Sequence, residues 1–395
     1  MSIGKLIALV VLLGGVLFLV LHLVDKPEGV LEISDVWPEN DRPRERRDPI
    51  PFTRSQQCRE CHPDVWREWY GSHHRLAYVN PEVQRLSKGF QDRDCLPCHL
   101  PRPIPETGFG YGIRPLERGA AREDGVDCFT CHHFPKSKVM LAAGPLGPGA
   151  ANAPCQPAVA KIVQTPNLCA PCHDQHKVHQ EWLESRFAVA GDGFKDCNSC
   201  HMPEVERKRA AGGPRTGRHH GFPAAHDPAM LRSAGSMTVT VAGQRRLLVV
   251  VANDGTGHNF PADERHRAVD LHLIVHTADG RRHDVRVARF RNPYRPDFEY
   301  VNPLPKPGDT YPADLTIGEL GYAKVIATRI AASFHPVRKV PYPQSTQIPA
   351  GEKRSYQITL PEGSVGATLR LWYRSNPFMA DKDAVLLHEK VLEKL

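Results

Sequence analysis

The first stretch of the chain is almost continuously apolar. From Leu6 to Val24 only His22 is polar, with Lys5 before the run and Asp25 after it. As a helix, such a run would span roughly 28 Å, close to the hydrocarbon thickness of a bilayer. No small-x-small cleavage site follows it. The pattern predicts one N-terminal transmembrane helix, residues 1–24, acting as an uncleaved signal anchor.

Helical periodicity is limited to short stretches in the next part of the chain. Residues 25–50 are rich in proline and charge and are predicted to form a tether, because they have too few apolar residues to fold alone. Within residues 51–232, apolar and aromatic side chains at helical spacing predict helices over Pro63–Tyr70 and Gln175–Phe187. Loops rich in proline and glycine separate them. We therefore expect a mostly helical and loop domain over 51–232.

After Arg232 the pattern changes to strict alternation of apolar and polar residues. Strands are predicted over residues 237–241, 246–251, 269–276, 282–289, 354–360 and 367–373. Ala278-Asp279-Gly280 is a typical hairpin turn between two of them. Strands at this spacing favour an antiparallel, immunoglobulin-like β-sandwich over residues 233–395. The predicted fold class is thus α + β and multidomain, with one transmembrane helix at the N-terminus.

The net charge indicates little about the function of the chain, whereas the cysteines indicate much. The formal net charge of +7 is modest and spread along the chain, so it does not indicate a nucleic-acid partner. All eleven cysteines lie between Cys58 and Cys200, and none follows. This asymmetry separates a cysteine-bearing half from the predicted β domain.

Ten of these cysteines belong to a repeated pentapeptide, Cys-x-x-Cys-His. Such a motif is typical of covalent haem c attachment, in which two cysteines form thioethers and the histidine ligates iron. The sequence predicts five haem c groups. Their attachment residues are Cys58, Cys61, Cys95, Cys98, Cys128, Cys131, Cys169, Cys172, Cys197 and Cys200. The proximal iron ligands are His62, His99, His132, His173 and His201.

Other uses of a Cys-x-x-Cys pair fit the repeat less well. A structural zinc site needs four ligands and no histidine directly after the second cysteine. A thioredoxin-like pair occurs once, and disulfides give no reason for the histidine. Haem c attachment takes place on the outer side of the membrane. The expected localisation is therefore the cell membrane, single-pass, with the haem and β domains in the periplasm.

The residues around these motifs resemble multihaem c-type cytochromes. After the first motif, Ser72-His73-His74-Arg75-Leu76-Ala77 resembles the family's Ser-x-His-x-x-Ala element, whose histidine ligates iron. Three further segments are similar to family elements: the last motif with Met202-Pro203, the segment His220-Gly221-Phe222-Pro223 and the segment Gly257-His258-Asn259-Phe260-Pro261. The resemblance covers roughly residues 55–395 and implies haems with two histidine ligands beside a sandwich domain.

The resemblance also implies distal iron ligands. It places this role on His74, His220 and His258, with His73 and His226 as alternatives to the first two. A surface or propionate-bonding histidine is the competing interpretation for each.

Two further distal ligands follow from position rather than from resemblance. His133 follows the proximal His132, so it points away from that haem and can reach a neighbouring one. His179, or His176 in its place, supplies the fifth distal position. Cys155 lies outside the motifs and is interpreted as an unpaired thiol, with a thiolate ligand or a crosslinking residue as alternatives.

The coordination of the iron separates two functions. Six-coordinate haems favour an electron carrier between a respiratory-chain donor and an external acceptor. Its expected partners are other redox proteins, and its N-terminal helix is expected to contact the inner membrane. A haem without a distal ligand would instead allow an oxidoreductase acting on a small nitrogen or sulfur compound. No Cys-x-x-Cys-Lys variant occurs, unlike in pentahaem nitrite reductases. The carrier is favoured, and the oligomeric state is open.

Overall fold

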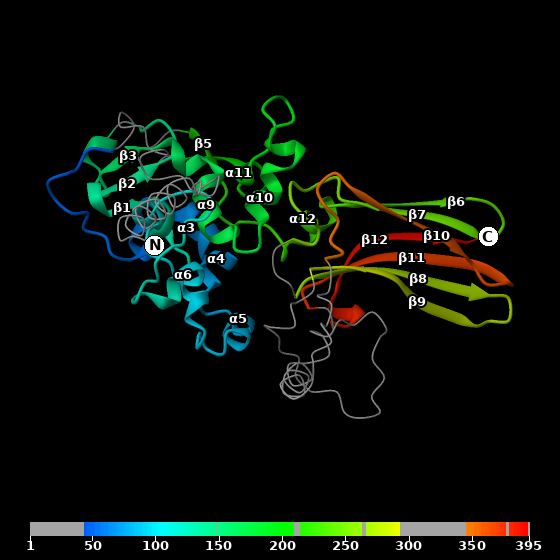
Figure 1. Cartoon of the computed structure of the whole chain (residues 1–395). Helices are drawn as coiled ribbons and strands as arrows, with labels where there is room; N and C mark the ends of the chain where they lie inside the picture. Colours follow the sequence, from blue (N-terminus) through cyan, green and yellow to red (C-terminus); the bar gives the residue numbers. More distant parts are fainter. Residues whose placement is uncertain are drawn as a thin grey trace, which may run out of the picture. The chain divides into compact units, whose positions relative to one another are not determined.

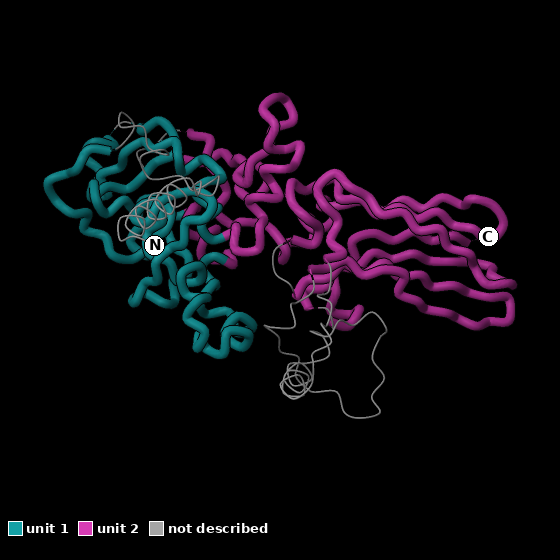
Figure 2. Tube along the Cα trace, in the orientation of Figure 1, with its two compact units in different colours: residues 1–63, 74–172, 209–213 teal, residues 64–73, 173–208, 214–395 magenta. Residues whose placement is uncertain are grey.

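The computed structural model describes residues 43–147, 149–208, 214–262, 266–292, 345–376 and 379–393. Helices and antiparallel sheets are both present, so the fold is mixed α + β. Contacts between Cα atoms divide it into two compact units. Among the described residues, the first contains 43–63 and most of 74–172, and the second contains 64–73, 173–208 and most of 214–393 (Figure 2).

In its described residues, the first unit consists of short helices and one small sheet. Strands β1 (His133–Phe134) and β2 (Val139–Ala142) are antiparallel, and β3 (Pro157–Val159) is parallel to β2. Phe134, Val139 and Leu141 from this sheet form a hydrophobic core with residues such as Phe109. The helices of this part of the chain are η1 (Ser55–Glu60), α4 (His73–Leu76), α5 (Pro81–Leu86), η2 (Arg93–Cys95), α6 (Leu96–His99), α7 (Ile104–Thr107), η3 (Arg122–Asp124), α8 (Cys128–His132), η4 (Pro135–Ser137), η5 (Ala150–Asn152), η6 (Lys161–Gln164) and α9 (Pro166–His173).

The helices of the second unit are also short. Its helices are α3 (Pro63–Tyr70), α10 (Val178–Leu183), η7 (Arg186–Ala188), α11 (Cys197–His201) and α12 (Pro228–Ser233), with η9 (Asp381–Asp383) among the strands. Strands β4 (Glu204–Lys208) and β5 (Pro214–Arg218) form an antiparallel pair. The predicted helix over Pro63–Tyr70 is confirmed as α3.

The other predicted helix, Gln175–Phe187, is wrong in its limits. It begins only at Val178, because Lys177 adopts a left-handed φ of 72°. It ends at Leu183, and Ser185 then takes an extended conformation in which its hydroxyl accepts a hydrogen bond from the Phe187 N–H. Local backbone geometry at both ends thus overrides the periodicity.

The rest of the second unit, as far as the structure describes it, contains seven strands: β6 (Ser236–Val241), β7 (Arg246–Ala252), β8 (Ala268–Thr277), β9 (Arg282–Phe290), β10 (Lys353–Thr359), β11 (Ser364–Arg374) and β12 (Val385–Leu392). They make two antiparallel sheets of order β10-β7-β6 and β12-β11-β8-β9 (Figure 1). Alternate side chains of both sheets, such as Val249 and Leu371, belong to one hydrophobic cluster. Leu231 of α12 lies in the same cluster, so the helix before the strands packs with them.

The predicted strands agree with six of these to within a few residues, the usual uncertainty of strand ends. The predicted turn joins β8 to β9, where Gly280 has a φ of 83° that favours glycine. Strand β12 was not predicted, because Leu386-Leu387-His388-Glu389-Lys390-Val391-Leu392 fits helical and strand periods alike. Pairing with β11, in which Leu392 faces Ala367, makes it a strand.

The last residues of the predicted tether contact the first unit. The Arg46 N–H donates to the Ser137 carbonyl at 3.0 Å, and the Ser137 hydroxyl donates to the Pro43 carbonyl at 2.7 Å. Ile50 is buried. Residues 43–50 therefore lie against the fold. The remaining tether, residues 25–42, lies outside the described residues, and the domain boundaries stay a prediction.

The predicted membrane localisation is corrected by the helix lengths. In the part of the chain that the structure describes, no helix is long and apolar enough to cross a membrane. The longest ones there, α3 and α9, have eight residues each. Such a helix extends about 12 Å, far less than a bilayer core. The predicted anchor, residues 1–24, lies outside the described residues.

Candidate haem-binding sites

The Cys-x-x-Cys-His motifs lie in single helical turns. The third and fifth form α8 and α11, the second and fourth end α6 and α9, and the first begins in η1. In a helix, residues i, i+3 and i+4 share one face. Both thiols and the imidazole of a motif are therefore directed to the same side, as one porphyrin requires.

An aspartate caps two of these turns. Asp127 precedes the third motif, and its carboxylate accepts the Thr130 N–H at 2.9 Å; Asp196 accepts the Ser199 N–H in the fifth motif at 2.7 Å. Such caps satisfy backbone donors at a helix start. The sequence contains a signal for these caps, an aspartate three residues before a threonine or serine.

Three motif histidines are oriented by backbone carbonyls. Nδ1 of His99 lies 2.7 Å from the Ala77 oxygen, Nδ1 of His132 lies 2.7 Å from the Leu141 oxygen, and Nδ1 of His201 lies 2.8 Å from the Pro223 oxygen. A carbonyl only accepts, so Nδ1 must carry the proton, and the Nε2 lone pair is left to bind a metal. Burial lowers the pKa of His132 and of His201, which keeps both rings neutral.

The motifs of the first unit lie together in pairs. The thiols of Cys58 and Cys128 are within hydrogen-bonding reach, as are those of Cys98 and Cys172. The first motif is thus beside the third, and the second beside the fourth. All eleven cysteines are free of disulfides. Among the described residues, no group of three or more His, Cys, Asp or Glu side chains is placed to bind one metal ion, as structural zinc would need.

In the second unit, the His258 ring lies near that of a motif histidine. Its ring and that of His201 are nearly parallel, with an interplanar angle of 15° and centroids 6.3 Å apart. An iron held between two imidazoles separates the ring centres by about 6 Å, given metal–nitrogen bonds of about 2 Å. The two rings therefore have the spacing of a bis-histidine iron site.

His179 has the surroundings of a metal ligand. It lies in α10, and the residue is only 6% exposed. Neither ring nitrogen has a hydrogen-bond partner within the described residues. Burying an unpaired imidazole is costly, and coordination of an iron would satisfy one nitrogen. Burial also lowers its pKa, which favours the neutral, ligating form.

The remaining predicted distal ligands, His74, His133 and His220, each make a contact of a different kind. The carbonyl of His74 accepts the Val126 N–H at 2.9 Å, next to the third motif. The His133 ring contacts Phe129 edge-on, with centroids 5.6 Å apart. Nδ1 of His220 lies 2.7 Å from the Arg218 carbonyl, which again leaves Nε2 as the metal-binding nitrogen. Which motif each of these residues serves stays a prediction.

The two alternative ligands, His73 and His226, instead pack on each other. Their rings stack with centroids 3.7 Å apart and an angle of 16°. This spacing is too short for an iron between them. Burial, together with the charges of His73 and Arg267, lowers the pKa of His226 to about 4, so the stacked ring is neutral at pH 7. Sequence reasoning did not predict this pair, because the partners come from distant segments.

Cys155 belongs to no motif, but it lies within electrostatic reach of Cys58 and Cys61 in the first one. Burial raises the pKa of its thiol, which favours the protonated form over a thiolate. Its backbone carbonyl accepts the Met140 N–H at 3.2 Å. The interpretation as an unpaired thiol stays a prediction.

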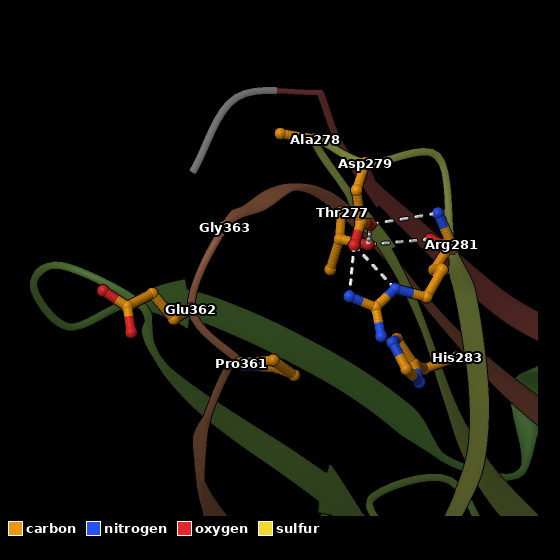
Figure 3. Close-up of a pocket in the computed structure, with 8 residues that line it drawn as sticks. All are labelled: Thr277, Ala278, Asp279, Arg281, His283, Pro361, Glu362 and Gly363. Carbon is orange, nitrogen blue, oxygen red and sulfur yellow. Dashed lines mark hydrogen bonds and ion pairs between the residues drawn. The ribbon is translucent and has the colours of Figure 1, made fainter.

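A surface recess lies elsewhere, at the turns of the second unit. It has a volume of about 410 Å³ and is lined by residues of the β8–β9 and β10–β11 connections, among them Thr277, Asp279, Arg281 and His283 (Figure 3). The Arg281 guanidinium and the Thr277 hydroxyl both donate hydrogen bonds to the Asp279 carboxylate. These hydrogen bonds lower the pKa of Asp279 to about 2. Asp279 and Arg281 thus pair with each other, Glu362 also lines the recess, and no motif residue does.

Comparisons with known proteins agree with the haem interpretation. The model of the family "Cytochrome c554 and c-prime" matches residues 57–133, which contain the first three motifs. The structure resembles that of a penta-heme cytochrome c552 from Thermochromatium tepidum, with a TM-score of 0.56 and 17% identity, over 87% of this chain and 100% of that chain. No match was found among curated proteins. The motifs and these likenesses support a multihaem c-type cytochrome with covalently bound haem c, whose general function is electron transfer.

Proposed function

We propose that this chain is a pentahaem c-type cytochrome that carries electrons between other redox proteins of a respiratory chain. The parallel rings of His201 and His258, with centroids 6.3 Å apart, carry the proposal. They fit an iron with both axial positions filled, which leaves no site for a substrate at that iron. The count of five rests on the five motifs and on the penta-heme neighbour.

The residues that would hold the haems follow from the motifs. Each cysteine pair would form the thioethers, and each motif histidine would be the proximal ligand. We assign the distal positions to His74, His133, His179, His220 and His258. Haem iron with two imidazole ligands changes oxidation state without losing a ligand, which suits electron transfer.

Close spacing of the haems is supported by the paired motifs. Thiols of the first and third motifs, and of the second and fourth, lie within hydrogen-bonding reach. Porphyrins attached at neighbouring cysteines must themselves be neighbours. Electrons would therefore pass over short gaps between haems.

We further propose that the seven strands are an immunoglobulin-like sandwich with a ligand-bearing loop. The sheet orders β10-β7-β6 and β12-β11-β8-β9 are compatible with that topology. His258 lies in the connection from β7 to β8. In this proposal the sandwich contributes one iron ligand to the haem of the fifth motif.

Carbon monoxide binding tests the carrier against an enzyme with an open haem. We expect the reduced protein to show a nearly unchanged haem spectrum on addition of carbon monoxide, because a six-coordinate iron has no vacant position. A pyridine haemochrome assay on the same sample should give five haems per chain. Carbon monoxide binding by a large fraction of the haem would contradict the carrier and favour an oxidoreductase.

A further inference from the structure

The loop that carries His258 is held from both sides. The His258 carbonyl accepts a hydrogen bond from Nδ2 of Asn253 at 2.7 Å and another from the Thr256 hydroxyl at 2.6 Å. Asn253 is fully buried, and its Nδ2 also donates to the Ile348 carbonyl at 2.8 Å. The sheet side of the loop is therefore anchored by a buried amide.

The other side of the loop is anchored by a carboxylate of α10. Glu181 accepts the backbone N–H of Asn259 at 3.0 Å through Oε2 and its side-chain Nδ2 at 2.6 Å through Oε1. Asn259 directly follows His258 in the chain. Hydrogen bonds to an ionised acceptor are stronger than neutral ones, and two parallel bonds also fix orientation. The contact thus restricts the backbone that aims the His258 ring.

Close packing at Gly257 holds the loop of His258 against α10. A Cβ atom placed on Gly257 would lie 2.9 Å from Cδ1 of Trp182 and 3.3 Å from Oγ of Ser185. The loop backbone therefore packs directly on the end of α10. Glu181 and Trp182 are adjacent, so the carboxylate contact and the close packing act at one place.

We infer that Glu181 is a positioning residue for the iron ligand His258. This inference rests on the proposed function, in which His258 and His201 bind the same iron. By holding Asn259, Glu181 sets the orientation of the His258 ring relative to His201 and keeps the ligand on the iron. Partners that orient metal ligands in this way affect metal affinity by about 10- to 100-fold.

The test is a set of variants of the full haem-loaded chain. Glu181→Ala removes both acceptors, and we expect the equilibrium between bound and dissociated His258 to shift by about 10- to 100-fold toward dissociation. Electron paramagnetic resonance should then show an altered low-spin signal for one haem, and carbon monoxide should bind that haem more readily. Glu181→Gln should restore wild-type behaviour, because its amide can accept the Asn259 N–H and donate to a flipped Asn259 side chain.

The matched control is Glu184→Ala, an exposed carboxylate at the end of the same helix. It should leave both measurements unchanged. If Glu181→Ala is indistinguishable from the wild type, or if Glu184→Ala has the same effect, the inference is overturned. Should Glu181→Ala yield no folded protein, Asn259→Ala removes the side-chain half of the contact and is judged by the same two measurements.

Failure of this inference is distinguishable from failure of the proposed function. If His258→Ala opens a haem and Glu181→Ala does not change ligand binding, only the role of Glu181 is wrong. If His258→Ala itself leaves every haem six-coordinate, the assignment of His258 as a ligand is wrong.

Discussion

Replacing His258 with alanine is expected to open one haem per chain to carbon monoxide. The His258 ring lies nearly parallel to that of His201 at the spacing of a bis-histidine iron site, and alanine cannot replace its nitrogen. The affected iron loses one strong ligand and should become high-spin. Difference spectra of the reduced protein with carbon monoxide, and a new high-spin paramagnetic resonance signal, measure the change.

His276→Ala is the matched control for this experiment. His276 is also in the β domain, but its side chain on β8 is exposed to solvent. We expect it to leave the spectra and the haem count as in the wild type. A His258→Ala protein that retains five low-spin haems and binds no carbon monoxide would refute the ligand role.

Replacing Asp270 with asparagine is expected to lower the free energy of unfolding by about 3–5 kcal/mol, the usual cost of breaking a buried ion pair. Asp270 is fully buried in β8. Its carboxylate accepts Nε and Nη2 of Arg289 at 2.7 and 2.8 Å and Nε of Arg374 at 2.7 Å. Asparagine has nearly the same shape but no charge, so two largely buried guanidinium groups lose this counterion, although Arg374 keeps its ion pair with Asp381.

The same carboxylate makes the stability depend on pH. Burial by itself raises the pKa of Asp270, but the hydrogen bonds and charges of Arg289 and Arg374 outweigh it and hold this pKa below its usual value. The carboxylate therefore stabilises the fold fully above its unfolded pKa of about 3.9. That contribution is lost as the pH falls from about 4 through the lower folded pKa. Asp270→Asn should lack this part of the acid dependence.

Urea denaturation followed by far-ultraviolet circular dichroism measures both effects, and amide hydrogen exchange assigns the loss to β8 and β11. The control is Glu389→Gln, which breaks the exposed pair between Arg370 and Glu389, at 2.6 Å on the same sheet. Exposed pairs contribute less than about 1 kcal/mol. An equally small loss for Asp270→Asn would show that the buried charges are compensated in another way.

Much of the fold was predictable where the period of the side chains is unambiguous. Six strands and the helix Pro63–Tyr70 follow from alternation or helical spacing, because burial of one face requires that pattern. Strand β12 was not predictable in the same way, since only its pairing with β11 decides between two periods. The helix over Gln175–Phe187 was predicted too long, because Lys177 and Ser185 leave the helical region of the backbone.

The haem-binding residues likewise divide into those that local spacing predicts and those that it does not. Attachment of haem depends on three side chains within one helical turn, so the spacing of Cys-x-x-Cys-His determines it locally. The second ligand of an iron comes from another part of the chain. Resemblance alone suggested His258, and neither resemblance nor spacing predicted that His73 and His226 stack on each other.

The sequence by itself determined the number of Cys-x-x-Cys-His motifs, the cysteines that we propose to form the thioethers and the alternation of the β domain, because each depends on neighbours within a few residues. Tertiary structure alone decided which histidine ring lies parallel to that of His201, which motifs lie in pairs, and that Glu181 holds the loop of His258. These are contacts between segments far apart in the chain. They depend on how the backbone folds back on itself, which no local spacing encodes.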